Sequence, residues 1–203
     1  RLIARDSGLV DFEGTEITRW KSRELSKRLA ILTQANNVQM KLTVRELVAF
    51  GRFPYSGGRL TQEDNEIIDR AIAYMELGDF EEQFIDELSG GQRQALSLLM
   101  STMTPIDLLI LDEHTAALDP KTAETVMQIT GRIVAEKGVT TLMVTHNMND
   151  AIRLGNRLIM MHEGHVIYDV AGDDKKSLTV ADLLQKFEEV SGGELANDRM
   201  LLS

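Results

Sequence analysis

Apolar residues recur along this chain in two patterns, one typical of helices and one typical of buried strands. Helical spacing of apolar side chains predicts amphipathic helices over residues 42–53, 61–77 and 178–190. Short aliphatic runs predict strands over residues 29–32, 108–111 and 139–144. The second of these runs is typical of a strand that is buried on both faces.

A pair of strand-like segments separated by a turn lies near the carboxyl end of the sequence. Residues 157–161 and 165–170 flank the dipeptide Glu163-Gly164, and this arrangement predicts a β-hairpin. His162 and His165 stand on either side of that turn, so we expect both side chains to face solvent.

The region richest in candidate chemistry begins with LSGGQRQ at residues 88–94. Ser89 is a good N-cap for a helix. Gly90 and Gly91 allow backbone amides to approach an anion at the positive end of that helix. A Ser-Gly-Gly turn alone has little meaning, because many turns contain it, and the alternative is a capped helix with a purely structural role.

Two acidic residues, Asp112 and Glu113, directly follow the aliphatic run at residues 108–111. They therefore stand at the carboxyl end of the predicted strand, where open α/β sheets place their ligands. One carboxylate can hold a divalent metal while its neighbour takes a proton from water. The alternative is a core strand followed by acids that have no function.

The composition makes several classes of function less favoured. Among 203 residues the net charge is −10, which argues against broad nucleic-acid binding and against unaided docking on anionic lipid. No apolar run approaches the ~20 residues that span a bilayer, so we expect any membrane role to come through a partner. The chain has no cysteine, which excludes disulfides and thiol chemistry and fits a reducing cytosol.

The order LSGGQRQ, aliphatic strand and Asp-Glu resembles the signature and Walker B segments of ABC-type ATPases. In this resemblance Gln92 belongs to the signature and Asp119 falls at the position of the D-loop aspartate. The resemblance implies an α/β fold of the P-loop NTPase (ABC ATPase) class, with a helical subdomain inserted in the core. It also implies the cofactors ATP and Mg2+.

The phosphate-binding P-loop of that class, G-x-x-x-x-G-K-[ST], does not occur in these 203 residues. None of the 15 glycines is followed by lysine. A stretch like DSGLVDFEGTEIT, near the start, follows the P-loop helix in the family. We therefore expect the sequence to be a fragment that begins after the P-loop and that binds ATP weakly or not at all when alone.

Two further residues match the family pattern at the ends of predicted strands. Gln34 follows residues 29–32 and resembles the Q-loop glutamine, although a solvated loop residue is the ordinary interpretation of such a position. His146 follows residues 139–144 and matches the switch histidine of the H-loop. His114 departs from the family, which most often has proline there; the alternatives are a pH-sensitive switch, a residue behind the site, or an exposed histidine.

The resemblance implies a role for each of these residues in ATP hydrolysis. Asp112 would hold Mg2+ through water, and Gln34 would contact the metal or the attacking water. Glu113 would orient or deprotonate that water, while His146 would contact the γ-phosphate.

In the same family the signature segment of one subunit closes over the ATP that the partner subunit holds. Ser89, Gly90, Gly91 and Gln92 would therefore serve the partner's nucleotide, and Asp119 would lie at the shared seam. The implied partners are a second ATPase subunit in a head-to-tail dimer, integral-membrane permease subunits and, indirectly, a substrate-binding protein. The implied location is the cytoplasmic face of the cell membrane, and no nucleic-acid partner is expected.

The expected domain organisation follows the same resemblance. Residues 1–39 would form the first part of the ATPase core, ending in the Q-loop, and residues 40–90 the helical subdomain. Residues 91–170 would complete the core with Walker B and the H-loop, and residues 171–203 would form a carboxyl-terminal helix and tail.

The two halves of the sequence resemble different branches of the family. The segments before residue 88, such as LTVRELVAFGRFPYS, resemble ATPases of iron–siderophore importers. LDEHTAALDPKTAETV, in the second half, resembles ATPases of amino-acid (tryptophan-like) uptake systems. A natural intermediate and a chimera joined near the signature both remain open.

Three functions compete at this point. The first is the energising ATPase subunit of an importer for an iron–siderophore or an amino acid. The second is a soluble ABC ATPase of the translation or DNA-maintenance type, for which we expect tandem domains, a coiled coil or basic patches. The third is a non-catalytic, degenerate ABC domain that acts in dimerisation or regulation, which the missing P-loop favours and the full set of other motif residues opposes.

Overall fold

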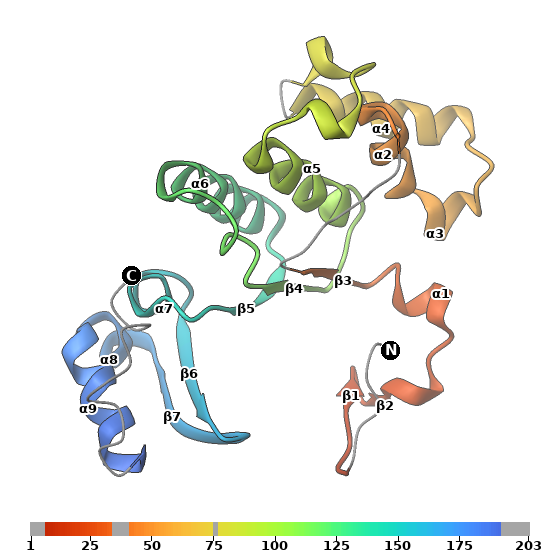
Figure 1. Ribbon diagram of the computed structural model, residues 1–203. Helices are drawn as coiled ribbons and strands as arrows, with labels where there is room; N and C mark the ends of the chain where they lie inside the picture. The colour runs from red at the N-terminus through yellow and green to blue at the C-terminus, as the bar shows by residue number, and fades with distance from the viewer. Residues whose placement is uncertain (1–6, 34–40, 75–76, 192–203) are drawn as a thin grey trace. The chain divides into compact units, whose positions relative to one another are not determined.

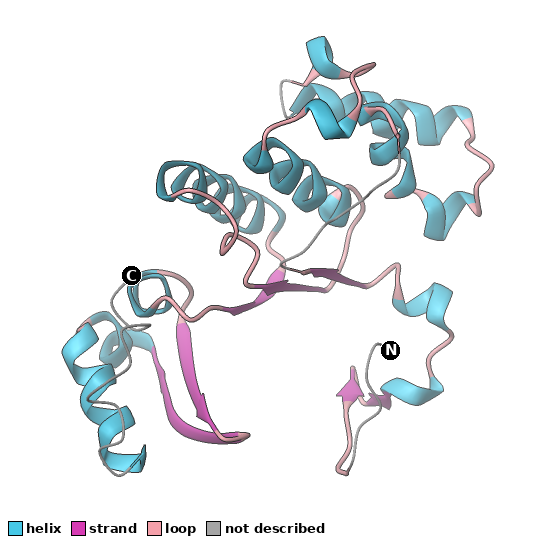
Figure 2. Cartoon of the chain, in the orientation of Figure 1, coloured by secondary structure: helices cyan, strands magenta, loops and turns pink. Residues whose placement is uncertain are grey.

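The computed structural model of the chain describes residues 7–33, 41–74 and 77–191. These residues group into two compact units, Arg1–Met143 and Val144–Ser203, which we describe separately. Figures 1 and 2 show that helices make up most of the first unit and that the longer ones lie on one side of a short sheet. Gln34 lies outside the described residues. In the described ranges, none of the helices has both the length and the apolar character that crossing a membrane requires.

The first unit begins with a small antiparallel hairpin formed by β1 (Asp11–Phe12) and β2 (Thr15–Glu16). The 3-10 helix η1 (Ile17–Arg19) and helix α1 (Ser22–Leu25) follow it. Helix α1 is only one turn long.

Arg28 ties this hairpin to the segment that precedes strand β4. Its guanidinium group contacts Glu13 at 2.6 Å and Asp107 at 2.5 Å. The same group lies 5.6 Å from the ring centroid of Phe12 and 5.7 Å from that of Trp20. The two rings also pack edge to face, with centroids 5.7 Å apart, so one cation holds a small aromatic cluster together.

A helical layer follows, and we use this term for helices α2, α3 and α4 with the short helices after them. Thr43 caps α2 through a capping box with Glu46, because its hydroxyl accepts the Glu46 amide while the Glu46 carboxylate accepts the Thr43 amide. One further helical turn, α3, follows α2. The elements of the layer are α2 (Val44–Phe50), α3 (Phe53–Ser56), α4 (Gln62–Tyr74), η2 (Gly78–Phe80) and η3 (Ile85–Glu87).

The helical layer contains a buried ion pair. Arg52 and Asp64 are 8% and 4% exposed, and the guanidinium Nε donates to the Asp64 carboxylate at 2.7 Å. The other oxygen of that carboxylate accepts from the backbone amide of Thr61 at 2.9 Å and from its hydroxyl at 2.8 Å. These hydrogen bonds, together with Arg52, hold the pKa of Asp64 below its ordinary value.

Helix α5 (Gly90–Thr102) stands between the helical layer and the sheet. Leu96 and Leu99 pack into the cluster formed with α2 and α4, whereas Leu98 packs against the sheet. The sheet has the order β3–β4–β5, with helix α6 (Pro120–Lys137) also packing on α5. Its strands are β3 (Leu29–Leu32), β4 (Leu108–Asp112) and β5 (Thr140–Val144).

The two faces of this sheet differ. Strands β3 and β4 pair in parallel, with Leu32 opposite Leu111, and both of these side chains are buried with Leu98 and Ile133. The opposite face is open: Ile31 and Leu142 are each 50% exposed. The prediction that residues 108–111 are buried on both faces is therefore wrong for the described chain, because α5 and α6 cover only one face.

The second unit is built around the predicted hairpin. β6 (Arg157–His162) and β7 (His165–Ala171) pair antiparallel around a turn in which Glu163 and Gly164 both have positive φ. Helices α7 (Met148–Arg153), α8 (Gly172–Lys176) and α9 (Val180–Ser191) accompany it. His165 faces solvent as predicted, but His162 packs edge to face on Phe187 of α9, with ring centroids 4.7 Å apart.

Candidate functional site

The carboxyl end of strand β4 carries the two predicted acids. Asp112 is the last residue of the strand and is exposed, and Glu113 follows it at the start of a turn. Glu113 has a φ of 46°, a left-handed backbone that costs a residue with a Cβ free energy, of order 1–3 kcal/mol. Its carbonyl accepts the amide of Ala116 at 3.0 Å, which closes the turn. The strand therefore delivers Asp112 and Glu113 to the edge of the sheet where parallel α/β folds bind ligands.

The signature segment begins helix α5 as the sequence predicts. The Ser89 hydroxyl accepts the amide of Gln92 at 3.2 Å, and the side chain of Gln92 accepts the amide of Ser89 at 2.9 Å. Both polar side chains thus form a capping box, which fixes where the helix starts. Ser89 and Gly90 remain exposed beside the positive end of the helix.

The two signature glycines have a packing role that sequence reasoning missed. A methyl group at Gly91 would overlap the methyl of Thr122 on α6, and one at Gly90 would lie 3.2 Å from Leu118 Cδ2. Glycine at these positions therefore lets the first turn of α5 approach the first turn of α6. The pair of small residues directly after the predicted N-cap Ser89 is visible in the sequence. The sequence does not show that α6 is the helix packed against it.

Asp119 is the N-cap of α6. Its carboxylate accepts the amide of Thr122 at 3.1 Å, and hydrogen bonds from Thr122 lower the pKa of Asp119. Because Thr122 also faces Gly91, the structure brings Asp119 and the signature turn together at two adjacent helix N-termini. A negative side chain at that place also complements the helix dipole.

His146 belongs to the second unit and lies in the turn between β5 and α7, with its side chain exposed. Its neighbours on both sides are fixed by local hydrogen bonds. The Thr145 hydroxyl accepts the Asn147 amide at 3.0 Å, and the Asn147 side chain caps α7 by accepting the Asp150 amide at 3.1 Å. The backbone at His146 is thus held in a defined turn.

His114 is buried, at 3% exposure, which removes the exposed histidine from the alternatives and agrees with a residue behind the acids. Its Nε2 lies 3.2 Å from the hydroxyl of Thr130, which is itself 6% exposed. Sequence reasoning missed Thr130, because its distance from His114 along the chain gives no local signal.

The acids fit a magnesium site only if the nucleotide completes it. Among the described residues, no group of three or more His, Asp or Glu side chains could hold a metal ion by itself. Mg2+ commonly binds through one or two carboxylates, with water and substrate phosphates as its other ligands. An exposed Asp112 at a strand end meets that requirement.

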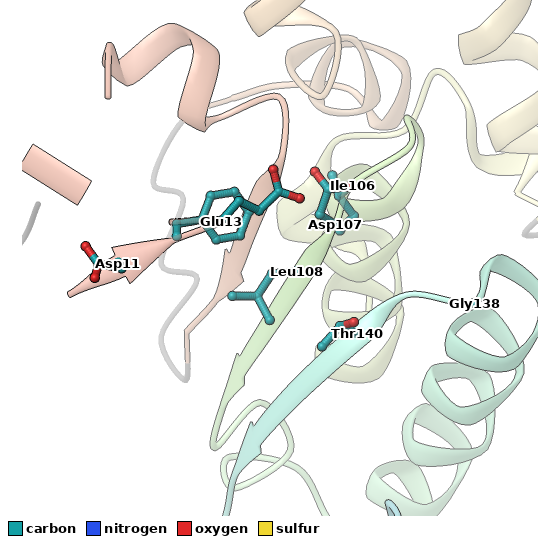
Figure 3. A pocket seen from close by; sticks show the side chains of 8 residues that line it. Asp11, Glu13, Ile106, Asp107, Leu108, Gly138 and Thr140 are labelled. Carbon is teal, nitrogen blue, oxygen red and sulfur yellow. The ribbon is translucent and has the colours of Figure 1, made fainter. Parts of the chain in front are cut away.

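A cavity of about 470 Å³ lies at the opposite ends of the strands. Figure 3 shows side chains from the hairpin, from the start of β4 and from the start of β5 around it. None of the predicted site residues that the structure describes lines it. The lining residues are Asp11, Phe12, Glu13, Ile106, Asp107, Leu108, Gly138 and Thr140.

Comparison with solved structures identifies the fold class of this chain. The chain is similar to a nucleotide-free ATP-binding cassette of an ABC transporter, with a TM-score of 0.71 and 20% identity over 90% of this chain and 75% of that one. It is also similar to cbiO1 of Clostridium perfringens, part of the complex cbiONQ, with a TM-score of 0.73 and 23% identity over 93% of this chain and 75% of that one. The fold is therefore the P-loop NTPase fold of ABC ATPase domains.

Sequence comparison adds the family. The model of the ABC transporter family matches residues 1–116. The petrobactin import ATP-binding protein YclP of Bacillus subtilis (strain 168) is 40% identical over 167 residues, which are 82% of this chain and 66% of that protein. A tyrosine transport ATP-binding protein of Clostridioides difficile (strain R20291) is 56% identical over 104 residues, 51% of this chain and 41% of that protein. The chain belongs to the ABC transporter family and spans less than two thirds of these relatives' length.

Proposed function

We propose that this chain is part of the ATP-hydrolysing subunit of an ABC importer. The observation that carries the proposal is the placement of Asp112 and Glu113 at the carboxyl end of β4, with Glu113 in a left-handed conformation. Strain at a non-glycine residue is common at functional sites, where the surrounding structure maintains it.

In the proposed reaction Asp112 would hold Mg2+ through water, and Gln34, which lies outside the described residues, would contact the metal or the attacking water. The ion, when bound, neutralises charge on the phosphates of ATP. The Glu113 carboxylate orients the attacking water and accepts its proton, while the His146 ring donates to the γ-phosphate. These roles come from the family resemblance and agree with the positions of Asp112 and Glu113 at a strand end.

The signature segment serves a second nucleotide in this proposal. The exposed start of α5 offers the backbone amide of Gly90, which takes no part in the capping box, to the phosphates held by a partner subunit, with Gly91 and Gln92 fixing that turn. Asp119, beside them, lies at the seam of the head-to-tail dimer. Permease subunits in the membrane and, through them, a substrate-binding protein complete the proposed assembly at the cytoplasmic face.

The transported substrate is proposed to be an iron–siderophore or an amino acid. YclP is a petrobactin import protein, and the C. difficile relative is a tyrosine transport protein. Measuring uptake of both substrate classes in cells that carry and lack the complete protein would separate these two possibilities.

The first test is calorimetric titration of MgATP into the 203-residue chain. We expect no saturable heat, because no glycine in these residues is followed by the lysine of a P-loop. Saturable micromolar binding would overturn the proposal that this chain is an incomplete nucleotide site.

The second test uses a complete protein that contains this segment together with a P-loop. We expect Glu113→Gln to lower kcat by about a hundredfold or more and to leave ATP binding intact, because the amide cannot accept a proton. The competing function is a degenerate module for dimerisation or regulation, which the lack of a Gly-Lys pair favours. A complete protein that dimerises without hydrolysing ATP would support that module instead.

A further inference from the structure

A buried polar pair lies directly behind the acidic end of strand β4. His114 is 3% exposed and Thr130 is 6% exposed, and they come from the turn after the strand and from the middle of helix α6. Burial of two polar side chains costs free energy unless they satisfy each other. Their contact, with Nε2 of the ring 3.2 Å from the hydroxyl oxygen, provides that partner.

The direction of this hydrogen bond follows from the hydroxyl. Thr130 Oγ1 donates to the carbonyl of Val126 at 2.8 Å, one turn earlier in the same helix. A hydroxyl has one proton to donate, so the oxygen is left to accept from the histidine. The ring of His114 therefore carries a proton on Nε2 and donates it to Thr130.

His114 is the next residue after Glu113, whose φ of 46° is unfavourable for a side chain with a Cβ. On one side Glu113 is fixed by Asp112, the last residue of β4. On the other side it is fixed by a ring that is buried and bonded to α6. An unfavourable backbone conformation persists only when the structure on both sides enforces it.

We propose that His114 is a positioning residue that holds Glu113 in its left-handed conformation through the hydrogen bond to Thr130. The inference rests on the proposed function, because it supplies the reason why the Glu113 carboxylate meets the attacking water. A general base must lie within hydrogen-bond reach of the proton it removes, and small misplacements cost large factors in rate. His114 itself touches neither nucleotide nor water in this proposal.

The first test uses the 203-residue chain and needs no activity. Long-range 1H–15N spectra of the imidazole report which ring nitrogen carries the proton, and the 13Cα and 13Cβ shifts of Glu113 report its backbone conformation. We expect a proton on Nε2 and left-handed shifts in the parent chain. Thr130→Val is expected to move the Glu113 shifts toward those of an ordinary turn, whereas Thr130→Ser, which keeps the hydroxyl, restores them.

A matched control lies on the same helix. The Thr125 hydroxyl donates to the Lys121 carbonyl at 3.1 Å, the same bond that Thr130 makes to Val126, but Thr125 is exposed. Thr125→Val should therefore leave the Glu113 shifts unchanged. Glu113 shifts that stay left-handed in Thr130→Val, or a proton on Nδ1 alone, would overturn the inference.

The second test measures steady-state ATP hydrolysis by the complete protein. We expect Thr130→Val to lower kcat by about ten- to a hundredfold with little change in the KM for ATP, and Thr130→Ser to recover most of the loss. If Glu113→Gln keeps full turnover, the proposed function fails. If Glu113→Gln is inactive while Thr130→Val keeps its kcat, only the positioning role is wrong.

Discussion

The helical layer and the three-stranded sheet differ in how completely their apolar side chains are buried. The layer closes against helix α5: α2, α4 and α5 surround a cluster that includes Val44, Val48 and Ile68, each 0% exposed. The sheet covers one face with α5 and α6 and leaves Ile31 and Leu142 half exposed on the other. Within the described residues, the layer and α5 therefore form a complete core, whereas the sheet has a core on one face.

The largest expected effect concerns the ion pair inside the helical layer. Asp64→Ala leaves the Arg52 guanidinium buried without its counter-charge, and we expect the free energy of unfolding to fall by about 3–5 kcal/mol. Chemical denaturation followed by circular dichroism measures this loss. The control is Asp69→Ala, which removes an exposed partner of Arg45 and should cost about 0–1 kcal/mol. Equal losses in the two variants would contradict a closed layer.

The next prediction compares the two faces of the sheet within strand β4. Leu109 is 0% exposed on the covered face, so Leu109→Ala should lower the free energy of unfolding by about 2–5 kcal/mol. Its neighbour Leu108 points to the open face and is half-buried, so Leu108→Ala should cost clearly less. If both variants lose the same free energy in the same denaturation assay, the open face is covered in solution.

Much of this contrast was accessible from the sequence, but not all of it. The strand bounds at 29–32 and the Ser89 cap follow from local patterns, and the structure confirms them. The four-residue run at 108–111 was misjudged because aliphatic residues at every position do not tell which face another element covers. What covers a face depends on helices far away in the sequence.

The candidate site shows the same limit. Asp112 and Glu113 were found from their position after a strand, since this requires only local information. The contacts of Gly91 with Thr122 and of His114 with Thr130 join residues on different elements, so neither could be predicted. The left-handed φ of Glu113 could not be predicted either, because a glutamate gives no turn signal.

A smaller effect is expected at the junction of α5 and α6, the two helices that cover the buried face of the sheet. Gly91→Ala forces the Thr122 methyl aside, and we expect a loss of about 1–3 kcal/mol in the free energy of unfolding. Adding Thr122→Ser removes that methyl and should recover most of the loss. The control is Gly131→Ala on α6, where no atom lies within 4 Å of the new methyl, and which should stabilise the chain by up to about 1 kcal/mol. A neutral Gly91→Ala would show that the helices can separate there.

The smallest expected effect is the decrease of the free energy of unfolding at acidic pH. Hydrogen bonds from Thr61 and Arg52 lower the pKa of Asp64 below its ordinary value of 3.8. Hydrogen bonds from Thr122 lower the pKa of Asp119 in the same way. The folded chain therefore binds fewer protons than the unfolded chain near that pH, and its stability falls as the pH drops from about 4 through the lower folded values. Urea midpoints from about pH 5 to pH 3 measure the slope. Asp119→Asn keeps a capping side chain and should flatten part of it; an unchanged slope would contradict the assignment to Asp119.

The aromatic cluster around Arg28 has a consequence for optical experiments. Trp20 is the one tryptophan in the sequence, and its ring contacts Phe12 and Arg28 beside the first hairpin. Its fluorescence therefore reports when that hairpin detaches, while circular dichroism reports mainly on the helices. If the fluorescence and circular dichroism transitions coincide, the hairpin and the helices unfold as one cooperative unit. If the fluorescence changes first, the hairpin unfolds by itself.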